Sequence, residues 1–127
     1  MARAVDLRVL PELLEVTGRH AELAGPTAPA RIFDKMTYSP WVDGRLNAHL
    51  RQEGVGTVVV TGGETDVCVL ATVLGAIDLG FHVIVLSDAV CSGADETHDA
   101  AVDLLGDRFS VQLDLMTTEE LLSMATT

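Results

Sequence analysis

The stretch that decides the fold is "TVVVTGGETDVCVLATVLGAIDLGFHVIVLS", residues 57–87. It opens with an unbroken β-branched run from Thr57 to Thr61, which is typical of a strand covered on both faces. A helix is then predicted to begin near Thr65 and to end at Gly80. A second buried strand follows over 82–87. A strand, a helix and a strand in this order indicate the α/β class, with right-handed crossovers.

The sequence before this unit predicts one further strand and one further helix. A short apolar step over 31–33 indicates a strand. Ser39 followed by Pro40 predicts a helix start, and that helix is expected to stop at Gly54. Residues 1–30 are the least organised part, because prolines interrupt them.

The sequence after the unit continues the alternation. A helix is expected over 95–105 and a strand over 111–116. Thr117 and Glu120 resemble a capping box that opens a terminal helix. We therefore predict a single domain over 1–127, with a mostly parallel sheet and flanking helices in three layers, α/β/α.

Composition excludes several classes of function. The 127 residues are 48% hydrophobic, which argues against disorder. The formal net charge of -11 disfavours binding to nucleic acid and to anionic membrane surfaces. Two cysteines are too few for a disulfide scaffold. No signal-peptide pattern and no membrane-length apolar run is present, so we expect a cytoplasmic globular protein.

Cys68 has the sequence context of a reactive thiol. Its place in the first turn of the predicted helix, after a strand end, gives it unpaired backbone N–H groups and the positive end of the helix dipole. Both lower the pKa of a thiol, and the same N–H groups can stabilise an oxyanion. Gly62 and Gly63 allow a strained turn there. The alternative is that Cys68 is a small, inert core residue.

Lys35 is the single lysine of the chain, and it follows the predicted strand over 31–33. A compact ammonium is suited to holding a thiolate or a carboxylate. The strand end places Lys35 at the edge of the sheet where ligands bind in α/β folds. A solvated surface lysine is the alternative.

Three stretches together carry a family resemblance: "FDKMTYSPW" (33–41), "TGGETDVCVLATVLGAIDLGFHVIVLSDAVCS" (61–92) and "ETHDA" (96–100). They resemble the isochorismatase-like cysteine hydrolases, from about Pro11 to the end of the chain. The resemblance is specific, because the lysine motif, the cysteine motif and the following strand have the family's order and spacing. It implies the Rossmann-like fold of that family.

The resemblance also implies roles for individual residues. Cys68 matches the nucleophile, and Lys35 matches the lysine of an Asp-Lys-Cys triad. The bond between Gly63 and Glu64 matches the family's cis peptide, and the backbone N–H groups of Glu64 and Cys68 match its oxyanion hole. In some family members the thiolate attacks an amide-type carbon, whereas other members cleave isochorismate without evident covalent chemistry.

One part of the family pattern has no counterpart in this sequence. The family's triad aspartate ends a central first strand, in a motif such as "LLVIDMQ". Asp6 is no credible substitute, because a proline-broken amphipathic stretch follows it. The resemblance therefore implies a member that is truncated at its N-terminus, lacking the first strand and the metal motif of the nicotinamidase branch. Without that strand, 57–61 is expected to present an open apolar edge, which invites pairing with a second chain.

Other residues gave weaker indications. Asp95, His98 and Asp99 lie close enough on one helix to bind a metal, although acids at a helix start are favourable without one. Asp88 is expected to have a structural role at a strand end. Cys91 and Cys68 lie after neighbouring strands, so a redox pair between them is an alternative.

The sequence thus favours a cysteine-dependent hydrolase of the C–N bond of a small amide, with no metal or organic cofactor. Tyr38 and Trp41, near Lys35, are candidates to line the substrate pocket. The missing aspartate predicts weak activity. The alternative is a catalytically inactive relative that forms homo-oligomers through the helix over 65–80 or through the open sheet edge.

Overall fold

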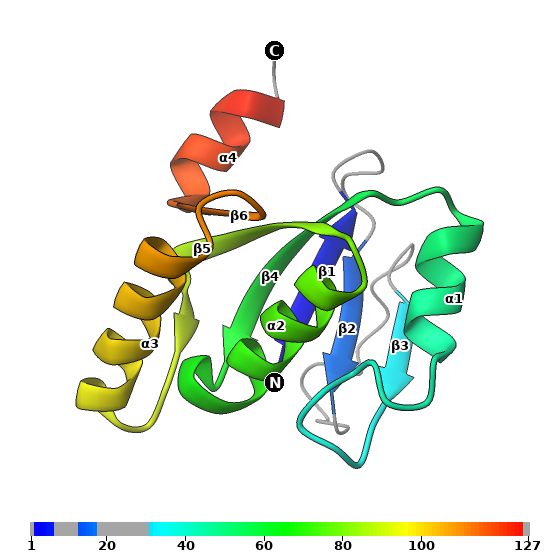
Figure 1. The fold of residues 1–127 in the computed structure, drawn as a ribbon, viewed down its shortest axis with the longest axis horizontal. Coiled ribbons are helices and arrows are strands. Elements are labelled where there is room, and N and C mark those ends of the chain that lie inside the picture. Colours follow the sequence, from blue (N-terminus) through cyan, green and yellow to red (C-terminus); the bar gives the residue numbers. More distant parts are fainter. Residues whose placement is uncertain (1, 7–12, 18–30, 126–127) are drawn as a thin grey trace.

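A computed structural model describes residues 2–6, 13–17 and 31–125, which form one mixed sheet with helices packed against it (Figure 1). The elements in chain order are β1 (Ala2–Asp6), β2 (Leu13–Thr17), β3 (Arg31–Asp34), α1 (Arg45–Gln52), β4 (Thr57–Gly63), the π-helical turn η2 (Thr65–Val69), α2 (Leu70–Asp78), β5 (His82–Cys91), α3 (Asp95–Arg108), β6 (Leu113–Met116) and α4 (Thr118–Ala125). The predicted α/β class is confirmed. The predicted strand over 57–61 and helix over 95–105 are each extended slightly.

The strand order is β3-β2-β1-β4-β5-β6, and the sheet is mostly parallel. β2 and β3 pair in parallel, as do β4, β5 and β6. β1 is antiparallel to both of its neighbours, so the other five strands share one direction. Their carboxyl ends consequently meet at one edge of the sheet, and the arrowheads of β2, β3, β4 and β5 in Figure 1 point to it.

The expectation of an open edge along 57–61 is wrong. β1 lies between β2 and β4 and pairs along β4, with Ala2 opposite Gly62 and Asp6 opposite Val58. A β-branched strand with an unpaired edge leaves a row of N–H and C=O groups without partners, and β1 satisfies these groups on β4. The sequence pattern of residues 1–30 did not predict this pairing, because the paired residues are more than fifty positions apart.

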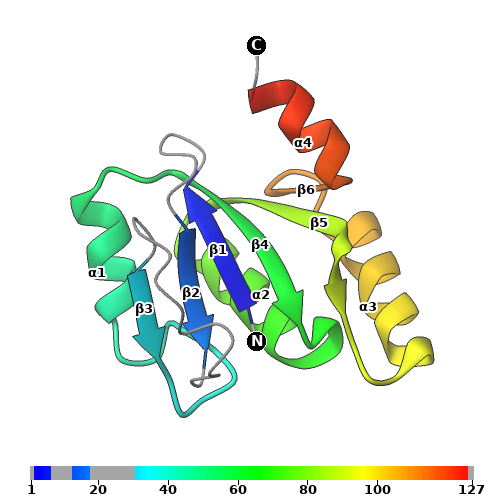
Figure 2. The ribbon, with the colours of Figure 1, turned by 180° about the vertical axis from the view of Figure 1, so that it is seen from behind.

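The main core lies on the face that α1, α2 and α3 share. Figure 1 shows α2 in front of the strands, and Figure 2 shows the strands in front of α2. Side chains alternate along a strand, so Val58 and Val60 of β4 point into this core. The helices contribute Leu50, Val73 and Leu105 among others, all of them buried.

The opposite face carries a smaller core under α4. Val59, Ile84 and Leu86 pack there with Leu121 of α4. Helices therefore cover both faces, as the three-layer prediction requires. The capping box at the start of α4 is confirmed, because the N–H of Glu120 bonds the Thr117 hydroxyl at 3.2 Å and the Glu120 carboxylate faces the Thr117 N–H at 3.4 Å.

Asp88 has the structural role expected of it. Its carboxylate accepts hydrogen bonds from the backbone N–H of Thr118 at 2.9 Å and from its hydroxyl at 2.8 Å. These two bonds hold the pKa of Asp88 below its ordinary value of 3.8. Asp88 thus ties β5 to the first residue of α4, whose unpaired N–H groups need acceptors.

The predicted helix start at Ser39 and Pro40 is wrong, since α1 begins at Arg45. Gly44, with a φ of 78°, precedes the helix, and the segment before it is a turn in which the Trp41 N–H bonds the Ser39 hydroxyl. Trp41 packs against α2: its indole N–H donates to the Thr72 carbonyl at 2.9 Å, and its ring stacks on Phe81. This tertiary packing outweighs the local helix signal.

Candidate active site

The turn that carries Cys68 lies at the carboxyl edge of the sheet, directly after β4. Glu64 is extended, with φ -92° and ψ 142°, and the helical turn begins at Thr65. The Glu64 carbonyl accepts from the N–H groups of Val67 at 3.2 Å and Val69 at 3.0 Å. The second bond closes the wide ring of a π-turn, a form that recurs at functional sites. Cys68 is therefore held in the first turn of a continuous helical segment, and its side chain is half-buried.

The peptide bond between Gly63 and Glu64 is cis, at the position that the family resemblance marks. Gly62 has a φ of 105°, a conformation that favours glycine. Gly63 lies against β5, where a Cβ would meet the Cys91 carbonyl oxygen at 3.0 Å and the Cys91 sulfur at 3.3 Å. Gly62 thus suits this connection by its backbone conformation, and Gly63 by the close approach of β5.

Thr65, near which the helix was predicted to begin, does not cap it. Glu64 occupies the cap position, and no side chain caps the turn. The Thr65 side chain is instead 0% exposed, with its hydroxyl 2.8 Å from Nδ1 of His98 on α3. A buried hydroxyl needs a partner, and His98 provides it.

The two carboxylates of the turn are engaged by the segment between β5 and α3. Glu64 Oε1 accepts from the backbone N–H of Gly93 at 3.1 Å, and Asp66 Oδ1 accepts from the Ser92 hydroxyl at 2.7 Å. The Thr97 hydroxyl, followed by that of Ser92, holds the pKa of Asp66 below its ordinary value of 3.8. A carboxylate with a lowered pKa is a weak base, so Asp66 is poorly suited to take the thiol proton.

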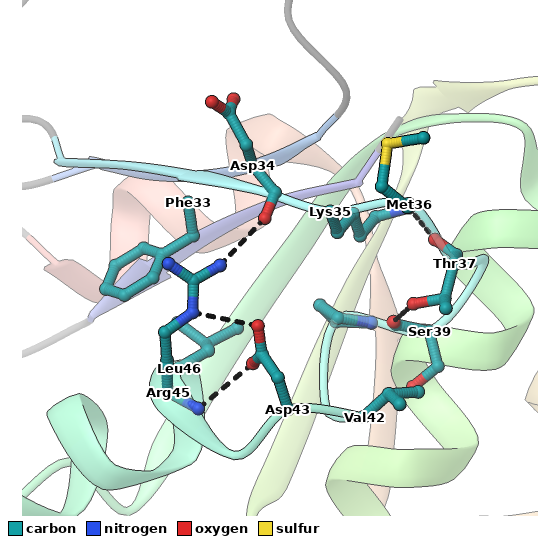
Figure 3. A pocket seen from close by; sticks show the side chains of 11 residues that line it. Phe33, Asp34, Lys35, Met36, Thr37, Ser39, Val42, Asp43, Arg45 and Leu46 are labelled. Carbon is teal, nitrogen blue, oxygen red and sulfur yellow. Dashed lines mark hydrogen bonds and ion pairs between the residues drawn. The ribbon is translucent and has the colours of Figure 1, made fainter.

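Lys35 lies in a cavity of about 320 Å³ between the end of β3 and the start of α1 (Figure 3). The cavity is lined by Phe33, Asp34, Lys35, Met36, Thr37, Ser39, Pro40, Val42, Asp43, Arg45 and Leu46. The Lys35 ammonium donates to the Thr37 carbonyl at 2.7 Å. The structure thus places the lysine at a strand end, as expected, beside a space large enough for a small molecule.

Arg45 is a second cation at this cavity, although no motif in the sequence marked it. Its guanidinium forms an ion pair with Asp43 at 2.8 Å and donates to the Asp34 carbonyl at 3.0 Å. The backbone N–H of Arg45, followed by its side chain, holds the pKa of Asp43 below the ordinary value. The pairing was readable in principle from the two-residue spacing of Asp43 and Arg45, but the cavity was not.

The two candidate pocket residues lie outside this cavity. Trp41 packs on α2 as described above, and Tyr38 is 69% exposed. Neither is among the residues that line the cavity.

The structure brings Gly63, Glu64 and Cys68 together in one turn, whereas Lys35 lies further along the same edge. β2 and β1 separate β3 from β4, which corresponds to about 14 Å between the two strand ends. Within the described part of the chain, no hydrogen bond or ion pair joins the Lys35 ammonium to the Cys68 thiol.

The described residues supply no acid in the position of the family's aspartate. β1 occupies the central position of the sheet but runs in reverse, so Ala2 lies at the edge near Gly62. Asp6 pairs with Val58, about 13 Å along β4 from Gly62. The reversed direction therefore places Asp6 away from the Cys68 turn.

The remaining candidates take other places. Cys68 and Cys91 are both free thiols, and Cys91 is exposed. His98 bonds Thr65, while Asp95 and Asp99 are exposed. Among the described residues, no group of three or more histidine, cysteine or acidic side chains is arranged to hold a metal ion. None of the helices in the described ranges is both long and apolar enough to cross a bilayer.

The amino-acid sequence matches the family profile described as the isochorismatase domain over residues 15–120. It is 33% identical over 88 residues to Nicotinamidase 3 of Arabidopsis thaliana, covering 69% of this chain and 44% of that protein. It is 42% identical over 64 residues to isochorismatase family protein 1A of Dictyostelium discoideum, covering 49% of this chain and 31% of that protein. The chain thus spans less than half the length of these relatives.

Solved structures show the same relationship. An isochorismatase-like hydrolase from Alkaliphilus metalliredigens is 31% identical with a TM-score of 0.70, covering 78% of this chain and 52% of that chain. A nicotinamidase from Staphylococcus aureus is 25% identical with a TM-score of 0.63, covering 69% and 55%. The fold and the sequence therefore point to one family.

Proposed function

Because the chain belongs to the isochorismatase family, we propose that it is a hydrolase of small amides whose nucleophile is the Cys68 thiolate. The observation that carries this proposal is the place of Cys68 in the first turn after β4, at the positive end of the segment formed by η2 and α2. Backbone N–H groups at such a position stabilise a thiolate. Two of the relatives bear the name nicotinamidase, which supports a small amide as the proposed substrate class.

The proposed reaction proceeds in two steps. The Cys68 sulfur attacks the amide carbon, and the N–H groups of Glu64 and Cys68 bind the oxygen of the tetrahedral intermediate. The C–N bond breaks, the amine takes a proton from water, and a thioester and a hydroxide remain. The hydroxide then attacks the thioester, which releases the carboxylic acid and restores the thiolate. One water is consumed for each amine and each carboxylic acid formed.

Lys35 is proposed to supply positive charge at the same edge rather than a direct contact. Its ammonium bonds a neutral carbonyl, that of Thr37, and keeps its charge available to an anionic group in the cavity. A substrate that carries a carboxylate or a carbonyl oxygen would gain from that charge. The lowered pKa of Asp66 makes it a weak base, and one carboxylate oxygen of Glu64 is held by the Gly93 N–H, which is why we propose low turnover.

The test combines thiol chemistry with product release. The rate of Cys68 alkylation by iodoacetamide is measured at pH 7 in a Cys91→Ser background and compared with that of free cysteine, and ammonia release is measured with nicotinamide and other small amides. We expect Cys68 to be alkylated faster than free cysteine, and ammonia release to stop in Cys68→Ser. Alkylation no faster than that of free cysteine, or activity that survives Cys68→Ser, would exclude the mechanism.

A second candidate function is favoured by the surface of the loop over 35–44. Met36 is fully exposed, and Val42 and Tyr38 are 70% and 69% exposed. Three large apolar side chains on one short loop are typical of an interface. We propose, as the alternative, an inactive family relative that associates through this loop with a second copy. Light scattering of the parent and of Met36→Ser with Tyr38→Ser tests it, because a dimer should become a monomer.

A further inference from the structure

Three side-chain hydrogen bonds tie the start of the Cys68 turn to one distant segment of the chain. Glu64, Thr65 and Asp66 follow the cis bond in sequence. Each is bound by the segment over 92–98, which connects β5 to α3 and begins that helix. The bonds are Gly93 N–H to Glu64 at 3.1 Å, His98 to Thr65 at 2.8 Å and Ser92 to Asp66 at 2.7 Å.

The bond between His98 and Thr65 is the least replaceable of these contacts. The Thr65 side chain is wholly buried, so water cannot substitute for the imidazole. His98 is half-buried and lies in the first turn of α3, which places it against the first residue of η2. The contact thus fixes the start of one helical segment against the start of another.

We propose that His98 and Ser92 are positioning residues for the Cys68 nucleophile. This inference rests on the proposed function, in which the backbone N–H groups of the turn stabilise the thiolate and the oxyanion. Those groups act only when they point at the charge, and a small rotation of the turn removes much of their effect. His98 fixes the turn through Thr65, and Ser92 fixes it through Asp66. Neither residue needs to touch substrate.

The experiment measures the rate of Cys68 alkylation by iodoacetamide at pH 7 in a Cys91→Ser parent. His98→Ala should slow this alkylation about 10-fold, because the backbone N–H groups of the turn no longer point at the sulfur. His98→Asn should keep the parent rate, because the asparagine amide can replace Nδ1 and bond the Thr65 hydroxyl. His82→Ala is the matched control: it also loses a hydrogen bond, to Asp114, but His82 lies opposite Thr57, roughly 20 Å along β4 from Gly63.

The outcomes separate the two proposals. A parent that is alkylated no faster than free cysteine overturns the proposed function, and this inference with it. A fast parent rate that is unchanged in His98→Ala overturns the positioning role alone, even when the melting temperature falls. An Asn variant that is as slow as the Ala variant likewise overturns it, because the hydrogen bond to Thr65 is then not what matters. Should circular dichroism show His98→Ala to be unfolded, Ser92→Ala is measured in its place, with the same slower alkylation expected.

Discussion

Substituting Gly75 with alanine should test the packing that holds Trp41 against α2. A Cβ at Gly75 would lie 2.2 Å from Cδ1 and 2.8 Å from Nε1 of Trp41, so the indole must move. The overlap costs about 2 kcal/mol, and losing the bond to the Thr72 carbonyl and the stack on Phe81 costs about 1 kcal/mol each. Alanine recovers about 1 kcal/mol of helix propensity. The net loss is about 3 kcal/mol, which corresponds to about 10 °C in Tm.

The assay is thermal unfolding followed by circular dichroism, together with the emission of Trp41, which is the single tryptophan of the chain. The emission should shift to longer wavelength as the displaced indole meets water. Gly106→Ala is the matched control: it lies in α3, where a Cβ meets only the terminal Cδ2 of Leu115 at 3.3 Å. That variant should melt at the parent temperature or slightly higher. A Gly75→Ala protein with unchanged Tm and emission would refute the packing described for Trp41.

Three further predictions concern the second core, the cap of α4 and the Cys68 turn. Leu121→Ala should lower the free energy of unfolding, measured in urea, by about 3 kcal/mol, because Leu121 is the α4 side chain buried on Ile84. A decrease of less than about 1 kcal/mol would contradict this packing. The pKa of Asp88 is lowered in the folded state by Thr118, so its contribution to stability is present above pH 3.8 and is lost as the pH falls through the lower folded value. The melting temperature of the parent should therefore fall more than that of Asp88→Asn between about pH 5 and pH 3. Equal falls in the two proteins would disprove the stabilising role of the bonds between Asp88 and Thr118. Thr72→Val removes the 2.7 Å hydrogen bond to the Cys68 carbonyl and should lower the free energy of unfolding by about 1 kcal/mol. Thr72→Ser keeps the hydroxyl and should restore that hydrogen bond.

The local sequence predicted the elements whose signals are self-contained. The β-branched run of β4 and the capping box at Thr117 each report their structure within a few residues. The family resemblance also marked the bond between Gly63 and Glu64, which is cis in the structure.

The sequence failed where distant residues decide the outcome. Ser39 and Pro40 carry a good helix-start signal, but the close fit of Trp41 on Gly75 draws this segment into a turn. Thr65 has the chemistry of a cap, yet its hydroxyl is buried against His98, thirty-three residues away. The direction of β1 depends on pairing with β4 and could not be read from residues 2–6. No local periodicity reports such contacts.

The reversed strand at the centre of the sheet has a consequence for the order in which the protein folds. β2 and β3, and separately β4 to β6, can associate as parallel groups from segments near in sequence, with short or helical connections. β1 joins these groups, and its pairing with β4 closes a loop of more than fifty residues. Non-local pairing of this kind is slow, since the loop entropy is lost before the contacts form. The joining of the two halves of the sheet should therefore be a late event, after both parallel groups exist.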